Sequence, residues 1–142
     1  MTSFFAGSAI AVYLFAFGYQ VSQLRKHAKA SSTAFQLATA LAIVLHGTAT
    51  FGLLFTTAGL DLSLLKICAL ISLVINVALF FSGLKKPIHS LFLFLFPISA
   101  LSLFAAISTP STKDAVVLSS TIEAHILVSI LAYSTLAIAA GR

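Results

Sequence analysis

The stretch LSLLKICALISLVINVALFFSGLKKP, residues 62–87, decides the fold class of this chain. It stays apolar for the length of a membrane crossing, with one early lysine, and ends at two lysines and a proline. A helix needs roughly 20 apolar residues to cross a hydrocarbon core of about 30 Å. The stretch therefore predicts a transmembrane helix over about 62–84, whose early Lys66 snorkels from the first turn to the headgroups.

The composition of the whole chain agrees with a membrane protein. Of its 142 residues, 60% are hydrophobic and only 8% are charged, and the mean hydropathy is +1.12. A soluble domain of this length needs far more charged surface to cover its core. We therefore expect an all-α polytopic membrane protein that forms a single transmembrane domain over residues 1–142.

Four further apolar runs are bounded by charged or turn-forming residues, so about five transmembrane helices are expected. The predicted spans are about 4–21, 34–55, 62–84, 89–108 and 122–141. Residues 109–120 are predicted to form a loop, because Pro, Ser, Thr, Lys and Asp cluster there. Pro97 is expected to kink the fourth span, since it removes a backbone donor.

The cations predict the orientation of these spans. Only Lys66 and Lys113 fall on the side that also carries all three acidic residues. The other six cations follow the first, third and fifth spans: Arg25, Lys26, Lys29, Lys85, Lys86 and Arg142. Because short loops rich in Lys and Arg stay on the cytoplasmic side, we expect the N-terminus outside and the C-terminus inside.

The charge distribution also bears on the first run and on partners. The first run has no basic region before it and carries its cations after it, so we expect a retained helix instead of a cleaved leader. The net charge of +5 is explained by topology and by anionic headgroups. Membrane lipid is therefore an expected partner, and nucleic acid is not.

The residue pattern offers no basis for hydrolytic or phosphoryl-transfer chemistry. There is no Gly-rich phosphate loop and no cluster of carboxylates. The single cysteine, Cys68 in the third span, allows no internal disulfide and no multi-thiolate metal site, and we expect it to be a small packing residue. We therefore expect neither hydrolysis nor phosphoryl transfer.

Polar side chains within the spans are the remaining candidates for a site, because such groups are costly in hydrocarbon. Asn76 in the third span is predicted to make an interhelical hydrogen bond. His27 lies in the first basic loop and His89 at the inner mouth of the fourth span, where polar side chains are ordinary. His46 and His125 remain.

His46 lies near mid-membrane in the second span, and His125 lies within the first turn of the fifth span. The residues alone leave two interpretations open for each. His46 is either hydrogen-bonded to a hydroxyl or carbonyl of a neighbouring helix or an axial ligand of haem iron, which takes a neutral imidazole. His125 is either an interfacial histidine near a helix N-terminus or such a ligand. We expect both rings to face the bundle interior, because unsatisfied nitrogens in hydrocarbon cost a few kcal/mol.

The two histidines are expected to lie at different depths. At 1.5 Å per residue, His46 is roughly 13 Å and His125 roughly 5 Å below the outer boundary. Two axial ligands approach an iron from opposite sides along one line. We therefore expect the two histidines not to share one iron within this chain.

Residues from about His46 to the end carry a resemblance to a known family. The matching segments are Asp61-Leu62-Ser63-Leu64-Leu65, Leu70-Ile71-Ser72-Leu73, Phe96-Pro97 and the pattern H-I-x-x-S-x-x-A-Y-x-x-L that begins at His125 and includes Ser129, Tyr133 and Leu136. These segments resemble the bacterial inner-membrane YpjD proteins. That group belongs to the wider cytochrome c assembly family, which includes the CcsA and HemX-like proteins.

The resemblance implies a cytochrome c assembly protein that binds or conveys haem b without catalysing a reaction. It implies His46 and His125 as the cofactor-binding residues and axial iron ligands, and other cytochrome c assembly proteins as partners. The chain departs from the family twice. It has no tryptophan, so it lacks the tryptophan-rich haem-presenting segment of CcsA proteins. It also ends after the fifth span. We therefore expect either that the chain is the N-terminal part of a longer protein or that the other half is supplied in trans.

The rival interpretation is a haem-free structural or transport subunit of a membrane complex. In that interpretation His46 and His125 only make hydrogen bonds between helices.

Overall fold

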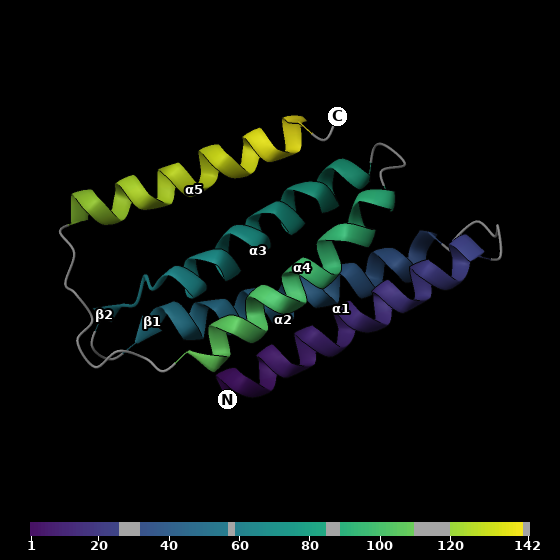
Figure 1. Cartoon of the computed structure of the whole chain (residues 1–142), viewed down its shortest axis with the longest axis horizontal. Helices are drawn as coiled ribbons and strands as arrows, with labels where there is room; N and C mark the ends of the chain where they lie inside the picture. Colours follow the sequence, from purple (N-terminus) through teal and green to yellow (C-terminus); the bar gives the residue numbers. More distant parts are fainter. Residues whose placement is uncertain (26–31, 57–58, 85–88, 110–119, 141–142) are drawn as a thin grey trace.

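The computed structural model describes residues 1–25, 32–56, 59–84, 89–109 and 120–140, which form five helices and a short hairpin (Figure 1). In chain order they are α1 (Thr2–Arg25), α2 (Ser32–Leu54), β1 (Phe55–Thr56), β2 (Gly59–Leu60), α3 (Leu64–Gly83), α4 (His89–Ser108) and α5 (Ser120–Ala140). The predicted spans agree with these helices to within a few residues. The predicted loop over 109–120 lies almost wholly outside the described residues.

The turn after α2 is a two-residue antiparallel hairpin in which Phe55 pairs with Leu60 and Thr56 with Gly59. Gly59 has a φ of 122°, which a residue without a side chain adopts at little cost. The Thr56 hydroxyl donates to the Gly59 carbonyl over 2.8 Å. The Asp61 amide then donates to the Leu54 carbonyl over 2.8 Å. Helix α3 begins after this contact, at Leu64, which is later than predicted.

The helices form a four-helix core with α5 on its outside (Figure 1). Helix α1 packs against α2 and α4, and α3 packs against α2 and α4. Among the described elements α5 packs mainly against α3. The core therefore excludes the fifth helix.

Buried side chains in the core recur every three or four residues, as in left-handed helix packing. In α1 they are Ala6, Ala9, Tyr13, Ala16 and Gln20. In α4 they include Phe92, Phe96, Ser99, Leu103 and Ala106. Small residues in these stripes let helices approach closely, which is how membrane helices gain packing without a hydrophobic driving force between them.

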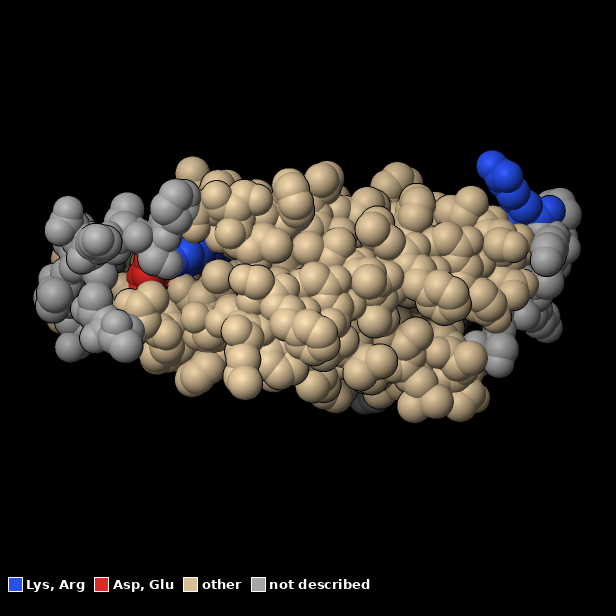
Figure 2. All heavy atoms as spheres, turned by 90° about the horizontal axis from the view of Figure 1, so that it is seen from below, with Lys and Arg blue, Asp and Glu red and all other residues tan. Residues whose placement is uncertain are grey.

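The outside of the bundle is apolar, as expected for a surface in contact with lipid. Four helical stretches are long and apolar enough to span a membrane: Thr2–Gln23, Thr33–Leu54, Leu64–Gly83 and Leu91–Ser108. The apolar stretch of α5, Ala124–Leu136, is shorter over the described residues. On the face shown in Figure 2, the charged side chains of the described residues lie only near the two ends. The chain is an all-α, multi-pass membrane protein.

The two ends of the bundle carry different features. The N-terminus and the hairpin lie at one end, which we call the hairpin end, and the last turn of α1 lies at the other, which we call the Arg25 end (Figure 1). The start of α1 and the end of α5 lie at opposite ends (Figure 1), which is the arrangement that five crossings would give. Which end faces the cytoplasm stays a prediction from the positive residues.

Candidate functional site: two histidines in different surroundings

His46 lies in the centre of the core, with none of its surface exposed. Its Nδ1 atom shares a hydrogen bond of 3.1 Å with the hydroxyl of Tyr13 in α1. The two rings meet edge to face, with centroids 5.7 Å apart, and Tyr13 packs in turn against Phe96 of α4. This arrangement is the interhelical hydrogen bond to a hydroxyl that one of the two interpretations of His46 describes.

The other ring nitrogen of His46 faces α3. The backbone of Ala69 approaches the ring, although Nε2 makes no hydrogen bond of ordinary geometry within the described residues. None of the described cavities is lined by His46. The ring of His46 is fully enclosed by its neighbours.

A polar network that includes the Ala69 carbonyl connects α3 and α4. The Ala69 carbonyl accepts a bond of 2.9 Å from the Ser72 hydroxyl, which shares a bond of 2.8 Å with the hydroxyl of Ser102. Asn76 donates to the Ser99 hydroxyl over 2.6 Å and to the Ser72 carbonyl over 2.8 Å. The prediction that Asn76 bonds between helices is confirmed. Polar contacts thus link α1 to α2 through the Tyr13–His46 pair and α3 to α4 through Ser72, Ser102, Asn76 and Ser99.

His125 lies on the outside of α5 and is exposed. Among the α5 side chains that the structure describes, Ile130 and Ser134 are buried, and His125 lies about 140° around the helix from Ile130, at 100° per residue. The expectation that His125 faces the bundle interior is therefore wrong. The expectation failed because α5 packs mainly against α3, and most of the surface of α5 therefore has no neighbour among the described residues.

The two histidines consequently lie in separate places. His46 is sealed within the α1–α4 core, whereas His125 is open on the far side of α5. One iron cannot contact both rings in this arrangement. The ring of His125 is accessible from outside the described residues, whereas the ring of His46 is not.

The cation that was expected to snorkel is instead buried. The Lys66 ammonium donates to the Asp61 carboxylate, and the two side chains are 1% and 5% exposed. The expectation of snorkelling is wrong because a carboxylate five residues earlier neutralises Lys66 inside the hairpin end. The Asp61 carboxylate also accepts the Ser63 amide over 3.1 Å. Burial alone raises the pKa of the Asp61 carboxyl, but the bonds from Lys66 and Ser63 outweigh it and hold this pKa below its usual range.

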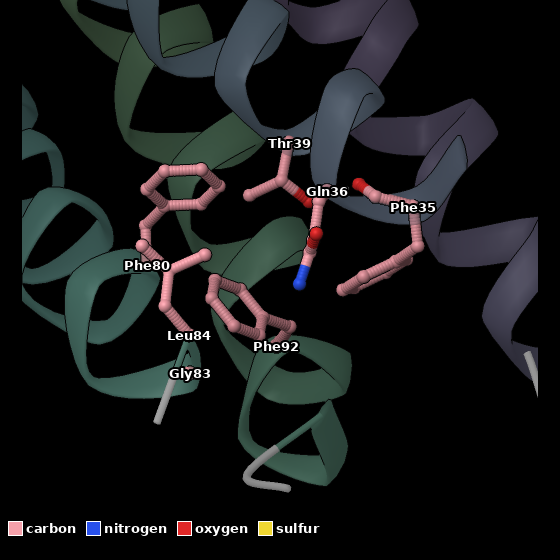
Figure 3. A pocket seen from close by; sticks show the side chains of 7 residues that line it. All are labelled: Phe35, Gln36, Thr39, Phe80, Gly83, Leu84 and Phe92. Carbon is pink, nitrogen blue, oxygen red and sulfur yellow. Dashed lines mark hydrogen bonds between the residues drawn. The ribbon is translucent and has the colours of Figure 1, made fainter. Parts of the chain in front are cut away.

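Three hollows among the described residues are small. Figure 3 shows one of about 10 Å³ between α2, α3 and α4, where the side chain of Gln36 lies between the rings of Phe92 and Phe35 in this view. Two grooves, one at each end, have volumes of about 230 Å³ and 240 Å³. All three are smaller than the roughly 300–1,000 Å³ of typical small-molecule sites, so none is a preformed haem pocket.

Comparison with protein-family models, with curated proteins and with solved structures finds no match to this chain. The residues described by the structure contain no group of three His, Cys, Asp or Glu side chains suited to a metal ion.

Cys68 is exposed, so the expectation that it is a packing residue is wrong.

Sequence reasoning missed two partners, Tyr13 and Asp61. For Tyr13 a signal was present, because it occupies the buried stripe of α1 that also holds Ala9 and Ala16. Once α1 and α2 are known to be adjacent, a polar residue in each buried stripe predicts a hydrogen bond between them. For Asp61 the signal was its spacing from Lys66, five residues across the start of a helix.

Proposed function

We propose that this chain is a haem-handling, non-catalytic component of cytochrome c assembly in a bacterial inner membrane, and that His125 is the iron ligand it presents. The observation that carries the proposal is the exposed imidazole of His125 on a largely apolar helix. Such a group needs a polar or metal partner at the membrane. Haem iron is a partner of the required kind, and the resemblance of the segment starting at His125 supports it.

The surroundings of His125 suit an apolar ring system. Ile122 and Val128, three residues before and after His125, are 48% and 66% exposed. On a helix these residues flank the imidazole on neighbouring turns, so they supply the apolar contacts that a porphyrin face needs. Bound haem b supplies the iron centre that is conveyed. The second axial ligand comes from outside the described residues, since His46 is sealed.

The proposal is tested by the absorption spectrum of the detergent-purified chain titrated with haem. We expect a Soret band that His125→Ala removes. His27→Ala is the matched control, because it removes an imidazole from the basic loop and should leave the band unchanged. A band of equal intensity in the wild type and His125→Ala would contradict the proposal.

The alternative is a haem-free structural or transport subunit. It is favoured by one specific observation, which is that His46 and Asn76 already have hydrogen-bond partners on neighbouring helices. In this case the titration gives no Soret band for any variant, and the imidazole of His46 acts only in helix packing.

A further inference from the structure

The groove at the Arg25 end lies between α1 and α2. It has a volume of about 230 Å³ and is lined by Phe15, Ala16 and Tyr19 of α1 and by Ala34, Phe35 and Ala38 of α2. Three of these residues are alanines, whose short side chains leave the hollow. The tyrosine is the one lining residue with a polar side-chain group. The groove therefore suits a flexible apolar chain with a polar end.

An exposed cation lies beyond the polar end of this groove. Arg25 in the last turn of α1 is exposed, and it follows Tyr19 by six residues, about 9 Å along the helix and about 120° around it. It is not a lining residue of the groove, so only the head of its long side chain can meet a headgroup at the groove's end. In the sequence, the segment that joins α1 to α2 adds Lys26 and Lys29. An apolar groove near an exposed cation at a helix end is complementary to a lipid with an anionic headgroup.

The groove at the hairpin end provides a comparison within the same molecule. It has nearly the same volume, about 240 Å³, and a lining that is apolar except for Thr50. The lysine of this end, Lys66, is buried and paired with Asp61. The two grooves thus share their size and their apolar lining. Among the described residues they differ in that an exposed cation lies near the Arg25-end groove.

We propose that the Arg25-end groove binds one acyl chain of an anionic phospholipid, whose phosphate interacts with Arg25. The acyl chain packs against Phe15 and the three alanines. Tyr19 lies at the level where the acyl chain meets the headgroup, as amphipathic aromatic rings do at membrane interfaces. The hairpin-end groove takes acyl chains without regard to headgroup charge. This inference stands on charge and shape at the Arg25 end and does not depend on haem binding.

The absence of tryptophan from the chain makes a matched experiment available. Phe15 and Phe51 line the two grooves and are 72% and 62% exposed. Phe15→Trp and Phe51→Trp therefore place a single indole in one groove each with little change of shape. Each variant of the full chain is reconstituted in phosphatidylcholine vesicles, and quenching of its tryptophan fluorescence by brominated phosphatidylglycerol is compared with quenching by brominated phosphatidylcholine.

We expect the indole of the Phe15→Trp variant to report a preference of about fivefold for phosphatidylglycerol, the factor expected for one cation at an anionic surface. The indole of the Phe51→Trp variant should report no preference. Adding Arg25→Gln to Phe15→Trp should remove the preference, whereas adding it to Phe51→Trp should change nothing.

Arg25 is exposed, so its substitution leaves the fold intact, which circular dichroism checks. Two results would overturn the proposal. One is an equal headgroup preference in the Phe15→Trp and Phe51→Trp variants. The other is a preference in the Phe15→Trp variant that survives Arg25→Gln.

Discussion

The four-helix core and the fifth helix place a histidine in opposite surroundings. In the core, His46 is enclosed, and its Nδ1 is bonded to Tyr13. On α5, His125 is open, on a helix that buries few of its side chains. A histidine in an apolar segment is thus not by itself a ligand. The hydrogen-bond partners on the neighbouring helices decide whether the imidazole stabilises the fold or stays accessible to a ligand.

The largest effect on stability should come from the hairpin end of the core. Asp61→Asn removes the charge that neutralises buried Lys66, and breaking a buried ion pair in this way costs about 3–5 kcal/mol. Reversible unfolding of the detergent-solubilised chain measures it. The double variant Asp61→Asn, Lys66→Met is the control, since it leaves no unpaired buried charge and should recover most of the loss. A single variant as stable as the wild type would show that Lys66 is not sealed.

The same ion pair predicts a pH dependence. The pKa of Asp61 is lowered by its partners in the folded protein, so its stabilisation is fully present above the unfolded-state pKa of about 3.9. It is lost as the pH falls through the lower folded-state pKa. Unfolding measured from pH 6 downward should therefore show a decline below about pH 4 that is absent from Asp61→Asn, and parallel curves for the two proteins would contradict the pairing.

A smaller loss is expected at the centre of the core. His46→Ala leaves a cavity and an unpaired Tyr13 hydroxyl, which together cost about 2–3 kcal/mol. Tyr13→Phe keeps the ring packing and removes one interhelical hydrogen bond, worth about 0.6 kcal/mol in a membrane protein. The same unfolding measurement compares the two variants. If Tyr13→Phe cost more than His46→Ala, the pair would not be organised as described.

The smallest effect on stability is expected on α5. His125→Ala removes an exposed ring, so the free energy of unfolding should change by less than about 0.5 kcal/mol. The comparison with His46→Ala in the same detergent tests the difference between core and fifth helix. A cost at His125 equal to that at His46 would mean that α5 is covered by other parts of the protein.

The sequence predicted the helices well because membrane spans depend on runs of apolar residues, and these are local. It predicted the Asn76 contact for a similar reason, since an amide in hydrocarbon needs a partner wherever it lies. It failed on Lys66 and on the direction of His125. Both depend on which element lies opposite: a carboxylate folded back at the helix start in one case, and a helix left at the edge of the bundle in the other. Local patterns do not contain that information.

The central claim is that His125 is available to haem iron and His46 is not. It is tested most directly by the haem absorption spectrum of the monomeric chain and of its His46→Ala and His125→Ala variants, each corrected for the folded fraction. The account predicts weak binding with an incomplete ligand set, which His125→Ala abolishes and His46→Ala preserves. A low-spin bis-histidine spectrum that either substitution alone abolishes would show that both rings bind one iron, and would contradict it.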